Sequence, residues 1–373
     1  MKKGHRTPPI LAAHPEDKEM DPARMAAQLG PKGEPVFPGF DQAAFDQSIS
    51  GQSAAKNREL CEKYKDEMDP AVLNYWEQYG VMKELFDAKI DDGMKKYSVH
   101  TPLHMVPGRR YPLLYFSHGG FQTPFQAETA GFSKLIEKEQ FIAVYPFNGG
   151  YSNEDAVTEF KRITDALREI DYPIDWTRVY AAGFSSGSDA TESIATQWPE
   201  LIAAAAPCPG SNAMYNSLCR ISHEAYEKCL FCQVPLICVG GDSDFGDTYP
   251  FPDHECYENF NIWMQDICRV KDWKYVAMEE GRNLVAKGEG IEQKIGVPFQ
   301  KKWVQSFEER NWYFGQQFDA AGRPVVEYVC GEGIPHIMTG CFASVVWEAV
   351  KHWSRNPETG ELIYTPVVMG GVN

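Results

Sequence analysis

The chain has 373 residues, of which 43% are hydrophobic and 24% are charged, and its formal net charge is −16. This composition is typical of a globular protein that can bury a sizeable core without disulfide bonds or bound metal ions. The net negative charge argues against nucleic acid or an anionic membrane as a partner. No apolar run approaches the roughly 18 residues that span a bilayer, and no apolar segment follows the basic start of the chain. We therefore expect a cytoplasmic protein.

Ten cysteines are many for a cytoplasmic chain. Only Cys229 and Cys232 form a C-x-x-C pair, and no second pair lies at the spacing of a zinc site. Several others lie inside apolar runs, as Cys238 does in "PLICVGG". This pattern predicts buried free thiols.

The start of the chain differs from the rest. Residues 1 to about 50 are rich in Pro, Gly, Ala and Gln without a clear period, which predicts an extended arm. Residues 53–92 are predicted to be helical, because Asp69-Pro70 is a typical helix start and Gly93 a helix stop. The aromatic stretch "AVLNYWEQYGVMKELF" is either a helix packed on a core or the wall of a lid. We therefore treat residues 1–95 as an arm and helical extension that could act as a lid.

Strands and helices alternate from residue 96 onward. Short apolar runs bounded by Pro or Gly predict buried strands, and "NEDAVTEFKRITDALREI" predicts a helix with one apolar face. The predicted strands are "KYSVH", "YPLLYFS", "FIAVYPF", "RVYAA", "LIAAAAP", "VPLICVGG" and "PVVEYVCG", and the further helices are "DATESIATQW", "CYENFNIWMQDICRV" and "CFASVVWEAVKHW". This order predicts an α/β domain over residues 96–373 with a mostly parallel sheet covered on both faces. The long polar segment 272–324 is predicted to be an insertion before the last strand.

A G-x-S-x-G motif, residues 183–187, lies between the predicted strand "RVYAA" and the helix that follows. This is the setting of a nucleophile elbow, a strained turn that exposes one serine. Glycines are needed because a side chain at Gly183 or Gly187 would meet the neighbouring strand or helix. Ser185 is the candidate nucleophile, and Ser186 begins the helix with an unpaired N–H. The alternative is a tight turn that only requires small residues.

A nucleophilic serine needs a base, and in this fold class the order along the chain is Ser, then Asp or Glu, then His. The loop "GGDSDFGD" supplies Asp242, Asp244 and Asp247, of which we favour Asp244 and keep Asp242 as the alternative. The loop "CGEGIPHIM" supplies His336 as the general base. Both loops directly follow strands, so they belong at the carboxyl edge of the sheet, where active sites collect.

Hydrolysis also needs hydrogen-bond donors for the developing oxyanion. In the loop "SHGGFQ", Gly119 and Gly120 let the backbone approach a ligand without a Cβ in the way. We assign the backbone N–H groups of Gly120 and Ser186 as the donors, with Phe121 as the alternative to Gly120. Phe121 and Phe184 are the candidate substrate-binding side chains.

Residues from roughly 96 to 355 resemble the α/β-hydrolase fold, and most of all esterases of the polyhydroxybutyrate depolymerase and feruloyl or acetylxylan esterase group. The stretches that carry the resemblance are "YPLLYFSHGGFQ", "IDWTRVYAAGFSSGSDAT", "WPELIAAAAPCPG", "VPLICVGGDSD" and "PVVEYVCGEGIPH". The resemblance implies a serine ester hydrolase without a metal or other cofactor, which acts through an acyl-enzyme. It implies Ser185 as nucleophile, His336 as general base and acid, and Asp244 as the residue that orients His336.

The expected substrate is a small or oligomeric ester. An aromatic content of 13% favours an aryl-tolerant pocket, so we expect short-acyl or aryl, feruloyl-like esters. The chain departs from the family where Gly240 stands in place of a common histidine, and the segments before residue 96 and at 272–324 lie outside the common core. The alternatives are a serine peptidase or thioesterase on the same fold, and an inactive hydrolase-like binding module. The complete Ser, Asp and His set argues against the inactive module.

Overall fold

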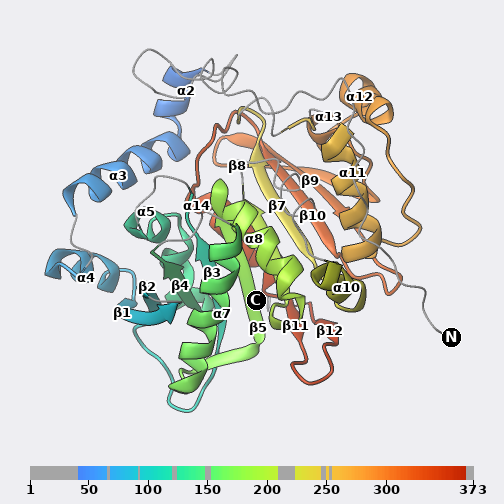
Figure 1. Cartoon of the computed structure of the whole chain (residues 1–373). Helices are drawn as coiled ribbons and strands as arrows, with labels where there is room; N and C mark the ends of the chain where they lie inside the picture. The colour runs from blue at the N-terminus through green and yellow to red at the C-terminus, as the bar shows by residue number, and fades with distance from the viewer. Residues whose placement is uncertain are drawn as a thin grey trace, which may run out of the picture.

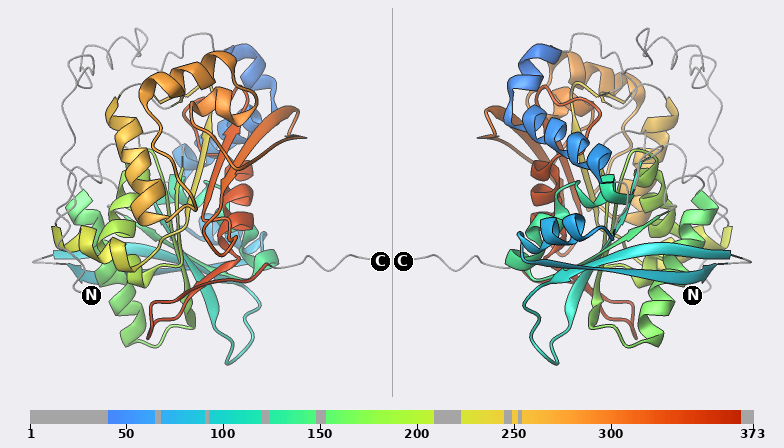
Figure 2. Two further views of the ribbon diagram at one scale, coloured as in Figure 1. Left: turned by 90° about the vertical axis from the view of Figure 1, so that its right-hand side faces the viewer. Right: turned by 90° about the vertical axis from the view of Figure 1, so that its left-hand side faces the viewer.

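The central feature of the computed structural model is one large sheet with helices on both faces (Figures 1 and 2). The structure describes residues 41–64, 68–90, 93–119, 124–147, 153–208, 223–244, 249–251 and 254–366. The strands of the sheet are β1 (Val81–Ile90), β2 (Gly93–Pro102), β3 (Tyr111–Ser117), β4 (Ile142–Pro146), β5 (Ile174–Phe184), β6 (Ala204–Cys208), β7 (Leu236–Gly241), β8 (Lys301–Phe307), β9 (Arg310–Gln317) and β10 (Val326–Gly331).

The middle of this sheet is parallel. Within the described residues the strand order is β1-β2-β4-β3-β5-β6-β7-β10-β9-β8. The strands from β4 to β10 in this order run parallel, whereas the hairpins β1–β2 and β8–β9 add antiparallel strands at the two edges. Strands β3, β4, β6 and β7 are buried along their whole length, because helices cover both of their faces. The predicted α/β architecture with a mostly parallel sheet is confirmed.

The helices of the described residues surround the sheet on both sides, some of them packed on other helices. They are α2 (Gln42–Gln47), α3 (Ile49–Lys63), α4 (Pro70–Glu77), α5 (Pro124–Glu128), α6 (Ile136–Glu139), α7 (Asn153–Glu169), α8 (Ser186–Gln197), α10 (His223–Phe231), α11 (His254–Ile262), α12 (Met278–Lys287), α13 (Ile291–Ile295) and α14 (Gly340–Val350). Helix α8 contacts β3, β5 and β6 in front of the sheet, and α14 contacts β6 and β7 behind it (Figure 1). Helices α2 and α3 lie beside the hairpin β8–β9, where the Ser50 hydroxyl donates to Glu308 over 3.0 Å (Figure 2).

Two predictions about the first part of the chain are wrong. Residues 81–90 form strand β1, paired with β2, and not a helix. Val81 and Lys83 are buried and Met82 between them is exposed, an alternation at the start of the strand that a buried lysine hides in the sequence. Helix α2 and the start of α3 replace the last part of the predicted extended arm, whose residues 1–40 lie outside the described residues.

The boundaries of two predicted segments also differ from those in the structure. The predicted division at residue 95 falls inside β2. The segment 272–324 contains α12 and α13 followed by the hairpin β8–β9, which extends the sheet next to β10. The polar character of β8 fits this place, since its side chains are mostly exposed at the sheet edge.

Lys83 is buried because it pairs with Glu128 at the end of α5. The Lys83 ammonium lies 2.8 Å from Oε1 and 2.9 Å from Oε2 of the Glu128 carboxylate, which also accepts hydrogen bonds from the Ser98 hydroxyl at 2.7 Å and the Trp76 indole at 3.2 Å. Burial alone would raise the pKa of Glu128, but the neighbouring charges of His100 and Lys83 lower it to about 2. The network joins α4, β1 and β2 to α5. The aromatic stretch around Trp76 is therefore packed on the core.

The cysteines described by the structure, nine in number, are free thiols, and seven of them are buried. Burial raises the pKa of Cys208 and Cys238. The predicted buried free thiols are confirmed for these residues, and Cys219 lies outside the described part of the chain. Among the described helices, none has both the length and the apolar character needed to cross a bilayer. The described residues also contain no group of three or more His, Cys, Asp or Glu side chains placed to hold a metal ion.

We expect Glu128→Gln to lower the free energy of unfolding by about 3–5 kcal/mol, because it leaves the Lys83 ammonium buried without a counter-charge. Urea unfolding would measure this. The double variant Glu128→Gln, Lys83→Met removes both charges, so it should recover a large part of the loss. A single variant within about 1 kcal/mol of the parent chain would contradict this account of the network.

The same carboxylate should make part of the stability depend on pH. Its pKa is lower in the folded chain, about 2, than in an unfolded one, so its contribution is complete above the unfolded pKa of about 4.3. It is lost as the pH falls through the folded value. The difference in unfolding free energy between the parent chain and Glu128→Gln should therefore shrink from about pH 4.5 downward, and a constant difference would refute the shift.

Candidate active site

The G-x-S-x-G motif forms a sharp turn between β5 and α8. Ser185 has φ 56° and ψ −125°, a left-handed φ that is unfavourable for a residue with a side chain. A Cβ at Gly183 would lie 2.0 Å from the Gly187 carbonyl oxygen, and a Cβ at Gly187 would lie 2.1 Å from the Ser117 carbonyl oxygen. Both positions therefore require glycine, as the motif predicts. The turn places Ser185 at the carboxyl edge of the parallel strands.

The structure brings Ser185, His336 and Asp244 together. The Ser185 Oγ lies 3.1 Å from His336 Nε2, and His336 Nδ1 lies 2.8 Å from Asp244 Oδ1. The Asp244 side chain is 1% exposed and that of His336 is 13% exposed. The aspartate is therefore shielded from water, while the imidazole retains a path to the outside. A donor on Nδ1 facing the carboxylate leaves the Nε2 lone pair facing the serine hydroxyl.

Neighbouring strands deliver the acid and the histidine. Asp244 follows β7 and His336 follows β10, and these strands are parallel neighbours with Gly241 opposite Gly331. A Cβ at Gly241 would lie 2.0 Å from the Ile334 carbonyl oxygen, so the two loops touch through their backbones. Their close packing fixes the distance between the two functional side chains.

Asp242 ties the same two loops together. Its Oδ1 accepts from the Gly333 N–H at 2.7 Å, and its Oδ2 accepts from the Lys294 ammonium at 2.7 Å. Both carboxylate oxygens of Asp242 are thus occupied by positioning contacts. Of the two acids considered from the sequence, Asp244 is the one that lies against His336. Asp247 lies outside the described residues.

The predicted oxyanion donors are only partly described. Gly120 and Phe121 lie outside the described residues. Ser186 is the first residue of α8, where a backbone N–H has no acceptor within the helix. The strand that leads to the loop "SHGGFQ" ends against the elbow, since the Ser117 carbonyl faces Gly187. The two assigned donors, Gly120 and Ser186, remain a prediction.

Phe184 is buried beside the imidazole. Its ring centroid lies 4.8 Å from that of His336, at an interplanar angle of 35°. The ring can therefore hold the imidazole from one side, a contact that the sequence did not suggest. Its predicted contact with substrate stays a prediction.

A small cavity, which we call the His336 pocket, opens beside the histidine and has a volume of about 200 Å³. It is lined by Ala54, Asn57, Arg58, Cys61, Gln126, Thr129, Ala130, Phe184, His336, Ile337 and Met338. Sequence reasoning missed its wall from α3, which was predicted only as part of a helical extension. The Ser48 side chain that caps α3 by accepting from the Gly51 N–H was a usable signal for the start of that helix.

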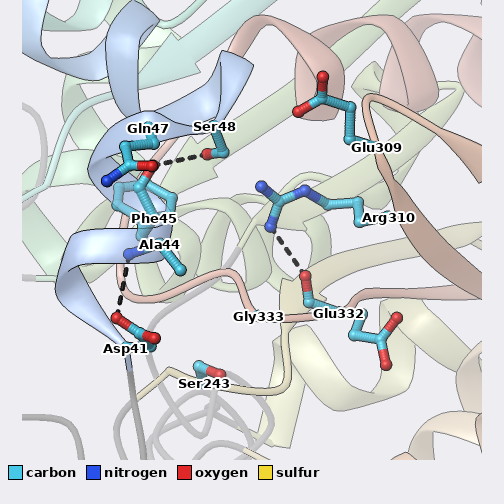
Figure 3. Close-up of a pocket in the computed structure, with 10 residues that line it drawn as sticks. All are labelled: Asp41, Ala44, Phe45, Gln47, Ser48, Ser243, Glu309, Arg310, Glu332 and Gly333. Atoms are coloured by element: carbon cyan, nitrogen blue, oxygen red, sulfur yellow. Dashed lines mark hydrogen bonds between the residues drawn. The ribbon is translucent and has the colours of Figure 1, made fainter.

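A second cavity, which we call the α2 cavity, has a volume of about 620 Å³ and borders the loops of Asp244 and His336 (Figure 3). It is lined by Asp41, Ala44, Phe45, Gln47, Ser48, Ser243, Glu309, Arg310, Glu332 and Gly333. The Arg310 guanidinium points toward Glu332 and donates to its backbone carbonyl over 2.8 Å (Figure 3). The charged groups that line this cavity are three carboxylates, those of Asp41, Glu309 and Glu332, and one cation, the Arg310 guanidinium.

Comparisons with known proteins point to ester hydrolases. The chain is 35% identical over 138 residues to a bifunctional acetylxylan esterase/xylanase from Neocallimastix patriciarum, a match that covers 35% of this chain and 20% of that protein. It is 30% identical over 127 residues to poly(3-hydroxyalkanoate) depolymerase C from Paucimonas lemoignei, a match that covers 30% of each. The chain thus spans less than a third of the length of both curated relatives. No protein-family model matches the chain.

Solved structures with a similar arrangement include esterases. A mutant of the feruloyl esterase module from Clostridium thermocellum complexed with sinapinate has 14% identity and a TM-score of 0.44, covering 73% of this chain and 87% of that one. A thermostable esterase has 18% identity and a TM-score of 0.35, covering 50% and 51%. From its sheet order, its elbow after β5 and its two loops after β7 and β10, the chain has the α/β-hydrolase fold, and its sequence is similar over about a third of its length to an acetylxylan esterase and a polyhydroxyalkanoate depolymerase.

Proposed function

We propose that the chain is a serine carboxylic ester hydrolase that works through Ser185, His336 and Asp244. The observation that carries the proposal is the continuous hydrogen-bonded series at the carboxyl edge of the sheet, from Ser185 Oγ through both nitrogens of His336 to Asp244 Oδ1. Such a series activates a serine that would otherwise be a poor nucleophile. The names of the two sequence relatives, an acetylxylan esterase and a polyester depolymerase, support ester hydrolysis as the reaction.

In the first half of the proposed reaction, Ser185 Oγ attacks the ester carbonyl carbon while its proton passes to His336 Nε2. Asp244 holds the imidazole in the required tautomer and stabilises the imidazolium that forms. The backbone N–H groups of Ser186 and Gly120 are the proposed donors to the oxyanion. The C–O bond to the alcohol then breaks, and the leaving alkoxide takes the proton from Nε2.

The second half repeats these steps with water as the nucleophile. His336 Nε2 takes a proton from water, the hydroxide adds to the acyl carbon, and the acid leaves as Ser185 regains its proton. The partly exposed His336 side chain suits this step, because water must reach it. An acetyl ester is the substrate in the name of one relative, so short-acyl esters are the substrates that we propose.

We expect Ser185→Ala to lower kcat/KM for p-nitrophenyl acetate by about 10⁴-fold or more, because the nucleophile is removed. The matched control is Ser186→Ala, which keeps its backbone N–H and should retain activity within about tenfold. Steady-state release of p-nitrophenolate would measure both. Equal activity in the Ser185→Ala variant and the parent chain would overturn the proposed function.

We expect Asp244→Asn to lower kcat by about 10⁴-fold. An amide NH₂ facing His336 Nδ1 would force the proton onto Nε2, where the base is needed. Asp242→Asn should instead keep kcat within about tenfold and reduce the free energy of unfolding by about 1 kcal/mol, because its partner Lys294 is partly exposed. Measurements of kcat and of urea unfolding on both variants would test which aspartate orients His336. A larger loss of kcat in Asp242→Asn than in Asp244→Asn would reverse the assignment of the acid.

A further inference from the structure

Helix α3 turns a polar face toward the His336 pocket. Its residues Ala54, Asn57, Arg58 and Cys61 all line that pocket, and they lie at the spacing i, i+3, i+4, i+7 that forms one face of a helix. In a helix that only packs on a core this face is apolar. Here it carries an amide and a guanidinium, so it is suited to meeting a polar group in the pocket.

This helix is held in place at several points. The Asn57 amide donates to the Thr129 carbonyl over 3.0 Å, and Cys61 Sγ lies 3.9 Å from the Thr129 hydroxyl. Nearer the start of the helix, Ser50 donates to Glu308 in the turn of the β8–β9 hairpin. Helix α3 also contacts α5, beside which it lies in Figure 1, and α14. Its polar face is therefore a fixed wall of the pocket.

The His336 pocket has an apolar part and a cationic part. Phe184, Ile337 and Met338 supply apolar surface directly around His336, and Arg58 lies on the opposing helix. Among the described residues that line the pocket, Arg58 is the one permanent cation and none is a carboxylate. The structure shows no hydrogen bond or ion pair between Arg58 and another described residue, so its donors are available to a ligand.

We propose that Arg58 selects ester substrates that carry a carboxylate a short distance from the scissile bond. This inference rests on the proposed function. A short apolar stem would lie against Phe184 and Met338, and the carboxylate would meet the guanidinium, whose planar fork matches it. The volume of about 200 Å³ is below the roughly 300–1,000 Å³ of sites for drug-sized ligands, so it suits such a small group.

The charge distribution around the site agrees with this choice of pocket. The chain as a whole carries a net charge of −16, which disfavours anionic ligands in general. The α2 cavity, with the carboxylates of Asp41, Glu309 and Glu332, would repel a substrate carboxylate. In the His336 pocket, by contrast, the described lining residues include the cation Arg58 and no carboxylate. An anionic group of a substrate is therefore favoured in this pocket.

The test uses the full chain and two pairs of esters that differ only in a carboxylate. In the first pair, monomethyl glutarate carries a carboxylate on the acyl side and methyl pentanoate is its neutral counterpart. In the second pair, 3-acetoxypropanoate carries a carboxylate on the alcohol side and propyl acetate is its neutral counterpart. Acid release in a pH-stat gives kcat/KM for each ester. In Arg58→Ala the ratio of anionic to neutral kcat/KM should fall by about three- to fivefold in at least one pair, mainly through KM, because Arg58 is exposed and exposed ion pairs contribute modestly.

Lys56→Ala is the matched control, because Lys56 is, like Arg58, an exposed cation of α3 but does not line the pocket. It should leave the ratio unchanged, and Arg58→Lys should restore part of it. An unchanged ratio in Arg58→Ala for both pairs, or an equal fall in Lys56→Ala, would overturn the inference while Ser185→Ala remains inactive. Hydrolysis that survives in Ser185→Ala would instead refute the proposed function.

Discussion

The contact between Gly187 and the end of β3 sets the geometry on which the site depends. The backbone of the elbow approaches the Ser117 carbonyl so closely that a Cβ would lie 2.1 Å from it, and Ser185 takes a left-handed φ as a result. Such a conformation costs on the order of 1–3 kcal/mol and persists only where the surroundings enforce it. Here β5 and its neighbours β3 and β6 are packed on both faces, so the strain is held by the most buried part of the sheet.

The same logic extends to the two loops that face the serine. A site of this kind needs its groups held to within about 0.5 Å, and loops alone are too mobile for that. Asp242 solves this by joining the loop of Asp244 to the Gly333 backbone and to Lys294 on α13. A carboxylate two residues from the acid therefore acts as a positioning group. Asp242 and Asp244, two positions apart in one loop, thus make different contacts, and Asp244 is the one proposed to orient His336.

The sequence predicted the structure well where neighbouring residues determine the conformation. It predicted the structure less well where a residue far along the chain determines it. The elbow needs glycines and a serine after a strand, and the parallel sheet brings the ends of later strands, which carry Asp244 and His336, to the same edge. The helix predicted from Asp69-Pro70 to Gly93 included β1, whose inward Lys83 hides the strand pattern and is tolerable only with Glu128 forty-five residues away. No local pattern contains that partner. The helical face of α3 was equally hard to recognise, since its inward side is polar.

The two features that the sequence did not reveal, strand β1 and the polar face of α3, belong to the surroundings of the proposed reacting groups. Glu128 ends α5, and Gln126 and Thr129 beside it line the His336 pocket together with α3. The buried ion pair thus holds one wall of the pocket, and Thr129 in turn holds Asn57 of the other wall. The proposed reacting groups follow the parallel strands, and the polar side of the pocket comes from α3 and from α5 with the residues after it. Because Arg58 lies on α3 and not on the strands and loops of Ser185, His336 and Asp244, the proposed role of position 58 in substrate choice can be altered without changing those three residues.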